Sequence, residues 1–208
     1  MSYSNNANAI KALLIDYIEN GNLIEDCVYG NELFYGTKKR QTDLLAVNGY
    51  TTAFEIKSKN DDFRKTREQL NDYKKVFDFQ YLVAHCSHEE KALKILKPNE
   101  GFILLDDDGT FSIRRHPKII VKQSKVEILN TMPLSFLKKH FKVHQRYKTV
   151  TDVRKHLESR SLNDLKTALR SFLRERLIPR NNVFREEKGT VTHFEDLKFL
   201  VSFPDIIV

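Results

Sequence analysis

The chain has 208 residues, of which 40% are hydrophobic and 30% are charged, and its formal net charge is +7. This length and composition can bury the core of one ordinary domain, and 7 Gly and 5 Pro without a repeat exclude collagen-like and low-complexity classes. No apolar run is long enough to span a membrane, and no basic leader or cleavage site opens the chain, so we expect a cytoplasmic protein without a membrane partner.

The positive charge is concentrated in one segment. Residues 118–180 contain 16 Lys and Arg against 5 Asp and Glu, whereas residues 1–117 contain 16 against 18. This layout is typical of a protein that grips a polyanion with one part and acts on it with another. We expect a first region over residues 1–117 and a basic helical region over residues 118–208 that packs on it.

The first predicted elements are a helix over about residues 7–19, closed by Gly21, and a strand over residues 26–35. If the strand turns back symmetrically through the loop that follows it, Glu32 lies directly across from Asp43. Glu32 could be an edge-strand charge that discourages aggregation, or a further metal ligand or water-positioning base.

The strongest functional signal is a predicted hairpin formed by residues 44–47 and 51–56 around Asn48-Gly49, a dipeptide that adopts positive φ angles at low steric cost. The two-residue period of a strand places Glu55 and Lys57 on one face. A cation beside a carboxylate in an otherwise apolar strand indicates either a solvated Glu–Lys pair or a catalytic site.

The register of this hairpin decides between the two interpretations. A two-residue turn would pair Val47 with Tyr50 and turn Glu55 away from Asp43. A three-residue loop, Asn48-Gly49-Tyr50, pairs Val47 with Thr51 and brings Asp43 opposite Glu55. We predict the three-residue loop with a bulge, or an equivalent bend. Two carboxylates there offer the hard oxygen ligands that Mg²⁺ or Mn²⁺ prefers, and Lys57 can stabilise a charged phosphate transition state.

These residues resemble the PD-(D/E)XK nuclease superfamily, in which an acidic residue, a hairpin and E-x-K build the active site; this chain has Asp43, Glu55 and Lys57, with Thr42 in the place of the proline. Gln69 and Tyr73 match the Q-x-x-x-Y element of the RecB-like branch. The resemblance covers about residues 7–116. This part of the chain also looks like a bacterial family of small stand-alone nuclease-like proteins. The resemblance implies that Asp43 and Glu55, with the carbonyl of Ile56, hold Mg²⁺ or Mn²⁺, and that Glu32 assists the metal or the attacking water. Lys57 would orient that water, and Gln69 and Tyr73 would position Lys57 or a phosphate.

Between the hairpin and residue 117 the pattern predicts a helix over residues 60–77 capped by Asn60 or Asp61, and a buried strand over residues 79–84. A capping box at residues 87–90 then opens a helix to about residue 96, and strands over residues 101–105 and 110–114 flank a turn at residues 106–109. For His85, Cys86 and His88, a strand end followed by a capped helix is favoured over a zinc site.

Beyond Pro117 the pattern is helical. Helices are predicted after Pro133, from Thr151 to Leu157, and after a cap at Ser161. On the last helix Lys166, Arg170 and Arg174 recur every four residues, which we interpret as an outward basic ridge. Together with Lys138, Lys139 and Lys142 this ridge is predicted to contact nucleic-acid phosphates without reading bases, although a basic helix can equally be a solvated face.

The sequence therefore predicts an α/β fold with a restriction-endonuclease-like core, a mixed central sheet flanked by helices, and a basic C-terminal helical appendage. The expected function is Mg²⁺-dependent hydrolysis of DNA, or of RNA, in repair, restriction or phage-related processes. Two alternatives stay open: a catalytically silent nucleic-acid-binding module, and an interaction subunit of a repair or defence complex.

Overall fold

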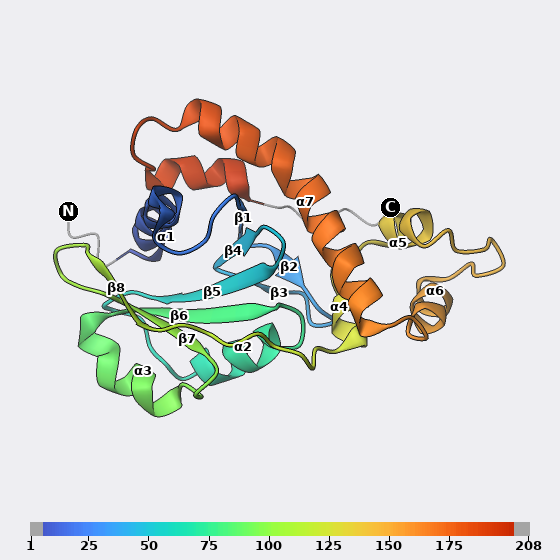
Figure 1. Cartoon of the computed structure of the whole chain (residues 1–208), viewed down its shortest axis with the longest axis horizontal. Coiled ribbons are helices and arrows are strands. Elements are labelled where there is room, and N and C mark those ends of the chain that lie inside the picture. The colour runs from blue at the N-terminus through green and yellow to red at the C-terminus, as the bar shows by residue number, and fades with distance from the viewer. Residues whose placement is uncertain (1–5, 202–208) are drawn as a thin grey trace.

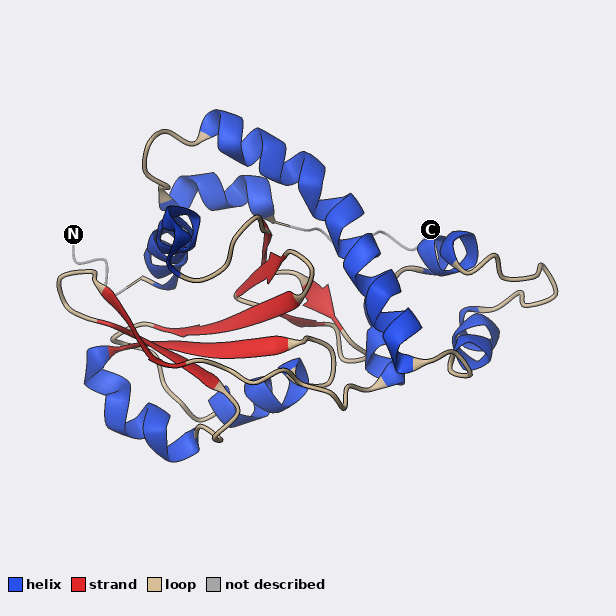
Figure 2. Ribbon diagram, viewed as in Figure 1, coloured by secondary structure: helices blue, strands red, loops and turns tan. Residues whose placement is uncertain are grey.

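The computed structural model describes residues 6–201, which form one six-stranded mixed sheet with helices on both faces (Figure 2). The spatial order is β1-β4-β5-β6-β7-β8, and only the β5–β6 and β6–β7 pairs are parallel. This confirms the predicted mixed central sheet. The strands are β1 (Val28–Asn31), β4 (Leu44–Val47), β5 (Thr51–Lys57), β6 (Phe79–His85), β7 (Gly101–Leu105) and β8 (Phe111–Arg115).

One face of the sheet is covered by helix α1 (Ala7–Tyr17), the end of α7 (Leu162–Glu187) and a short 3-10 segment, Phe194–Leu200 (Figure 1). Alternate residues of β5, Phe54 and Ile56, point into this layer because successive strand side chains face opposite sides. The predicted first helix is confirmed, and Gly21 follows it with a φ of 78°, a conformation that glycine adopts without steric cost.

The opposite face packs on α2 (Thr66–Tyr73), α3 (Glu89–Ile95), α4 (Lys125–Thr131) and the first half of α7. Helices α5 (Leu134–His140) and α6 (Val150–Leu157) extend from this layer at one end of the molecule (Figure 1). A single hydrophobic cluster joins strand residues such as Leu45 to helical residues such as Leu129 and Leu169, so the C-terminal helices share a core with the sheet.

The chain between β1 and β4 forms a second, two-stranded sheet from β2 (Phe34–Tyr35) and β3 (Arg40–Gln41). The predicted register is confirmed, because Asn31 pairs with Leu44 and the Glu32 amide donates to the Asp43 carbonyl at 3.4 Å. The prediction of one strand over residues 26–35 was wrong. Glu32 has a φ of 52°, a left-handed conformation that cannot continue a strand, so the pairing breaks there and resumes in β2.

The β4–β5 hairpin has the predicted three-residue loop, with Val47 paired with Thr51 and Leu44 with Phe54. The role given to Asn48-Gly49 was wrong, because neither residue has a positive φ. The loop is closed instead by the Asn48 side chain, whose Oδ1 accepts the Tyr50 amide at 2.9 Å, and by the Asn48 amide, which donates to the Tyr50 carbonyl at 3.0 Å.

Several predicted helix starts were wrong because a side chain made a different local bond. Helix α2 begins at Thr66 rather than near residue 60, since Asp61 accepts from the Ser58 amide at 2.7 Å and holds a turn. The capping box at residues 87–90 does not form; the Ser87 amide donates to His85 Nδ1, and a 3-10 turn precedes α3. Thr149, not Thr151, caps α6, whereas Ser161 caps α7 as predicted.

The outer edge of β1 is closed by a side chain from α7. Asn181 is fully buried, its Oδ1 accepts the Tyr29 amide at 2.7 Å, and its Nδ2 donates to the Tyr29 carbonyl at 2.8 Å. This amide substitutes for a neighbouring strand at that position, which removes an unpaired edge. Among residues 6–201, no helix has the length and apolar composition needed to cross a membrane.

Candidate functional site

The candidate site lies at the end of β5, on the face that packs against α2. Glu55 is fully buried, and the Lys57 ammonium lies 2.8 Å from Glu55 Oε1. Both side chains point to the same face because they are two residues apart on a strand. Lys57 Nζ also donates to Gln69 Oε1 at 3.2 Å, so the ammonium is held between β5 and α2.

Asp43 enters this cluster from the residue just before β4. One step beyond the Leu44–Phe54 pair, it lies opposite Glu55, and its Oδ2 accepts the Ile56 amide at 2.8 Å. That hydrogen bond fixes the carboxylate against the strand that carries Glu55. The structure therefore brings together Asp43, Glu55 and Lys57, as the three-residue loop requires.

Helix α2 contributes two side chains one turn apart. Gln69 contacts Lys57, and the Tyr73 hydroxyl donates to Glu55 Oε2 at 2.9 Å while accepting the Asp43 amide at 3.3 Å. Tyr73 thus links both carboxylate-bearing strands to the helix. Positions i and i+4 of a helix share a face, which is why this pair reaches one site.

Burial dominates the electrostatics of the cluster. The pKa of Glu55 is raised to about 7, chiefly by burial and also by the nearby Asp43 charge, while Lys57 and the Tyr73 hydrogen bond oppose the rise. Burial also raises the pKa of Asp43, while the Ile56 amide and the charges of Lys11 and Lys57 oppose the rise. Desolvation raises the pKa of Tyr73 well above its ordinary range, so this phenol stays a hydrogen-bond donor.

The donor set fits a small hard cation. Carboxylate oxygens from Asp43 and Glu55 are the ligands that Mg²⁺ and Mn²⁺ prefer, and Glu55 Oε1 is buried with the Lys57 ammonium 2.8 Å away. The Ile56 carbonyl belongs to the same strand, and its amide already anchors Asp43. A bound cation would offset the unfavourable burial of the two carboxylates.

Glu32 does not join the cluster through its side chain. Its carboxylate is 44% exposed and pairs with Lys11 Nζ at 3.2 Å, although its backbone lies across from Asp43 as predicted. The left-handed backbone at Glu32 accompanies this departure from the strand. Lys11, only 3% exposed, also donates to Asn31 Oδ1 at 2.9 Å.

Two nearby charges were missed by the sequence reasoning. Lys11 lies on the buried face of α1, three and four residues before Leu14 and Ile15, and this position was a readable signal for a functional or paired cation. Asp61 lies close enough to raise the pKa of Asp43, and its carboxylate accepts the Ser58 hydroxyl at 2.6 Å. The sequence pattern indicated only a helix-capping role for Asp61.

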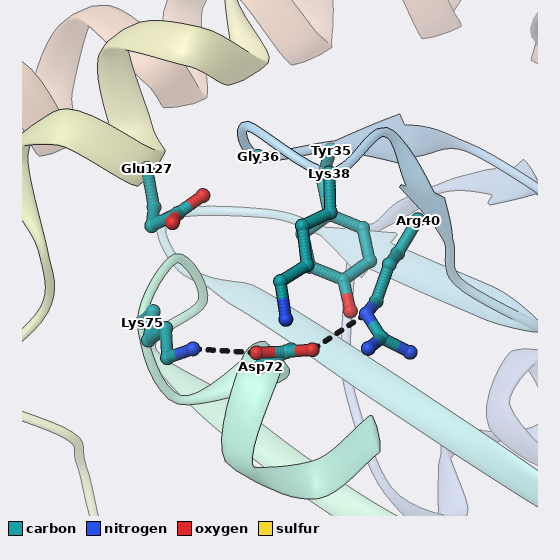
Figure 3. A pocket seen from close by; sticks show the side chains of 7 residues that line it. All are labelled: Tyr35, Gly36, Lys38, Arg40, Asp72, Lys75 and Glu127. Carbon is teal, nitrogen blue, oxygen red and sulfur yellow. Dashed lines mark hydrogen bonds and ion pairs between the residues drawn. The ribbon is translucent and has the colours of Figure 1, made fainter. Parts of the chain in front are cut away.

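A small pocket lies among the β2–β3 hairpin, α2 and α4 (Figure 3). Asp72 forms ion pairs there with Arg40 at 2.6 Å and with Lys75 at 2.5 Å, while the Tyr35 ring packs on Tyr73. These contacts tie α2 to the β2–β3 hairpin and so fix the helix that presents Gln69 and Tyr73. The pocket is lined by Tyr35, Gly36, Lys38, Arg40, Asp72, Lys75 and Glu127.

The predicted basic ridge on α7 does not face outward. Lys166 Nζ lies 2.8 Å from Asp78 Oδ1, and the Arg170 guanidinium makes two contacts of 3.2 Å with the same carboxylate. Asp78 is 2% exposed, and it also accepts the Thr51 amide at 3.0 Å. Lys166 and Arg170 therefore hold α7 on the sheet, and only Arg174 of the ridge makes no such contact within the described chain.

The other predicted nucleic-acid contacts lie at the exposed end of the molecule. Lys138 is half-buried and Lys139 is exposed on α5, and Lys142 is exposed just after it. Across residues 138–160 there are 8 Lys and Arg against 2 Asp and Glu. These residues belong to a longer segment, residues 134–160, which contains α5 and α6 and which we call the α5–α6 knob; it extends away from the sheet in Figure 1.

Taken together, the fold and the site define a mixed α/β protein with two buried carboxylates and a lysine at the end of a central strand. The chain belongs to the family described as bacteriophage P4 protein cII, whose family model matches residues 2–201.

A curated relative is Protein cII of Enterobacteria phage P4, which is 24% identical over 132 residues, covering 62% of this chain and 50% of the relative. The match thus spans about half the length of that relative. Among solved structures, the SPO1766 protein of unknown function from Silicibacter pomeroyi is 16% identical with a TM-score of 0.36, covering 65% of this chain and 84% of that one. A likeness at this level carries no structural argument.

Proposed function

We propose that this chain is a metal-dependent nuclease with a PD-(D/E)XK-type site on a restriction-endonuclease-like core. The observation that carries the proposal is the convergence of Asp43, Glu55 and Lys57 on one sheet face, under Gln69 and Tyr73. A solvated Glu–Lys pair does not account for this arrangement, because Glu55 is fully buried and shares its site with a second carboxylate. Buried carboxylates with raised pKa values are characteristic of functional sites.

The residues have distinct roles in this proposal. Asp43 and Glu55, with the Ile56 carbonyl, hold Mg²⁺ or Mn²⁺, which when bound supplies Lewis-acid activation of a phosphoryl oxygen and a water. Lys57 orients the attacking water and stabilises charge that develops on the phosphate. Gln69 positions the Lys57 ammonium, and Tyr73 holds Glu55. Glu32 and Lys11 form a charge pair at the margin of the site rather than binding metal.

The substrate is a nucleic acid whose phosphates bind to the α5–α6 knob. The exposed cations of the knob include Lys139, Lys142, Arg146 and Lys148, and acidic neighbours are few. Lys166 and Arg170 are excluded from this role because they neutralise Asp78. Phage-related nucleic-acid processing in the cytoplasm is the setting we propose, in keeping with the phage relative.

Cleavage assays test the enzyme. Linear, circular and single-stranded DNA, and RNA, are incubated with Mg²⁺, Mn²⁺ or EDTA. Wild type should cleave at least one form only with metal, Asp43→Asn should abolish cleavage, and Lys57→Ala should lower the rate on the order of a hundredfold while leaving metal binding intact. Asp108→Asn, on a turn beyond β7, is the matched control. Absence of metal-dependent cleavage on every form would favour the silent binding module.

Binding assays test the contact between the α5–α6 knob and nucleic acid. Replacing Lys139, Lys142 and Lys148 with Gln should weaken binding to unrelated sequences about equally, and should flatten the slope of log K against log salt by about 2 to 3. Unchanged affinity and slope would favour the interaction-subunit alternative, in which the knob contacts an acidic protein.

A further inference from the structure

A second cluster of metal-ligating side chains lies at the carboxyl edge of the parallel strands. His85 is the last residue of β6, Cys86 follows it, and Asp107 lies in the turn after β7. Because β6 and β7 are parallel neighbours, their carboxyl ends meet at the same sheet edge. The ligand atoms of these three residues lie within 4.8 Å of one another.

The spacing of these atoms matches a tetrahedral site. His85 Nε2 lies 3.2 Å from Asp107 Oδ1, Cys86 Sγ lies 3.8 Å from Asp107 Oδ2, and Cys86 Sγ lies 3.9 Å from His85 Nε2. Zinc bonds of about 2.0–2.3 Å at tetrahedral angles place such atoms about 3.3–3.6 Å apart. His85 and Cys86 thus approach different oxygens of Asp107, and a modest rotation of the exposed Asp107 carboxylate would bring one oxygen toward both.

The imidazole of His85 also has the outer partner that a metal ligand requires. Nδ1 lies 2.9 Å from Ser87 Oγ, which can accept a hydrogen bond from Nδ1–H and so leave the Nε2 lone pair for a metal. The alternative tautomer, in which Nδ1 accepts the Ser87 amide at 3.2 Å, leaves Nε2 as the donor to Asp107. Ser87 thus supports both tautomers, so metal binding costs one backbone hydrogen bond at that amide.

We propose that His85, Cys86 and Asp107 bind a zinc-type transition-metal ion at a site separate from Asp43 and Glu55. The mixed nitrogen, sulfur and oxygen donors select such an ion against Mg²⁺, which prefers oxygen alone. Three protein ligands leave a fourth position for water. Lys59 now pairs with Asp107 at 3.2 Å; it is 46% exposed, and its flexible side chain can leave when the ion binds. This proposal does not depend on the nuclease function.

The test is a titration of the reduced full chain with Co²⁺, which reports a thiolate ligand through a sulfur-to-cobalt charge-transfer band in the near ultraviolet. Wild type should show the band, Zn²⁺ should displace it, and excess Mg²⁺ should not. Cys86→Ser should lose the band. Asp107→Asn should weaken Co²⁺ affinity by at least about tenfold, because even outer-shell partners of a metal site contribute that much.

Three variants serve as matched controls. Cys27→Ala removes the other cysteine, Asp108→Asn changes the next carboxylate of the same turn, and Asp43→Asn disables the candidate magnesium site. All three should keep the band and the wild-type affinity. The proposal would be overturned if wild type showed no band or if the band survived Cys86→Ser. It would also be overturned if Cys27→Ala or Asp43→Asn removed the band, or if Asp107→Asn and Asp108→Asn bound Co²⁺ with equal affinity.

Discussion

The Tyr73 hydroxyl donates a hydrogen bond to Glu55 Oε2 at 2.9 Å and so joins helix α2 to the buried carboxylate of β5. This bond stabilises the ionised form of Glu55 and lowers its pKa against the stronger effect of burial. The same hydroxyl accepts the Asp43 amide, so one phenol organises both acidic positions.

Tyr73→Phe should therefore raise the pKa of Glu55 further and lower the free energy of unfolding by about 1 kcal/mol, with the fold retained. Carbon-detected NMR titration of the Glu55 carboxyl and denaturant unfolding measure the two effects. Tyr35→Phe, which keeps the ring in tilted contact with Tyr73, is the control. An unchanged Glu55 pKa in Tyr73→Phe would show that the hydroxyl does not influence the carboxylate.

Metal-free protein should lose stability as pH rises from about 4.5 to about 7 because of Glu55. Its pKa is about 7 in the folded chain against an ordinary 4.5, so between these values the folded state binds more protons than the unfolded state. The free energy of unfolding then falls with rising pH, by on the order of 3 kcal/mol in total. Glu55→Gln should flatten this part of the stability profile in EDTA, whereas exposed Glu90→Gln should leave it unchanged. Equal slopes in both variants would contradict the assignment.

Asp78→Asn should destabilise the fold by about 3 kcal/mol, because Lys166 and Arg170 would lose their shared carboxylate at a buried position. These contacts lower the pKa of Asp78 below its ordinary value of 3.8, although burial opposes them. The stabilisation is therefore present above about pH 4 and is lost as pH falls through the folded-state pKa. Chemical denaturation at pH 7 and pH 3 measures the loss of unfolding free energy in Asp78→Asn, with Asp108→Asn as control. An equal loss at both pH values would rule out the ion pairs as the source of the stabilisation.

Gly101→Ala should destabilise the sheet by about 1–3 kcal/mol, since a Cβ at this first residue of β7 would lie 2.4 Å from the Tyr81 ring. Tyr81 cannot easily move, because its ring stacks on Phe54 with centroids 5.5 Å apart. Gly49→Ala is the matched control; its Cβ would meet nothing within 4 Å, and its φ is not positive. Thermal unfolding of the two variants compares them directly, and similar midpoints would refute the steric argument.

The parts of the structure that the sequence predicted are those set by local periodicity. Alternation in residues 51–57 placed Glu55 and Lys57 on one face, and the requirement that Asp43 share it selected the loop that the structure contains. The i, i+4 relation of Gln69 and Tyr73 likewise specified a shared helix face. Strands β6 and β7 were found because continuous apolar runs are typical of buried parallel strands.

The parts that were missed depend on partners far away in the sequence. Arg170 meets Asp78 across 92 residues, so its spacing with Lys166 looked like a solvated ridge although both face a buried carboxylate. Lys11 was not singled out, because its partners, Asn31 and Glu32, lie beyond the helix that carries it. Helix starts failed where Asp61 and Ser87 formed local side-chain bonds that compete with capping.

The closure of the β1 edge by Asn181 has a consequence for biosynthesis. Tyr29 and Asn181 are 152 residues apart, and at about 5–20 residues per second a ribosome needs on the order of ten to thirty seconds to make the intervening chain. During that interval the nascent sheet presents an open edge, which can pair with another growing chain on the same messenger. Translation speed and chaperone supply should therefore influence the soluble yield of this protein.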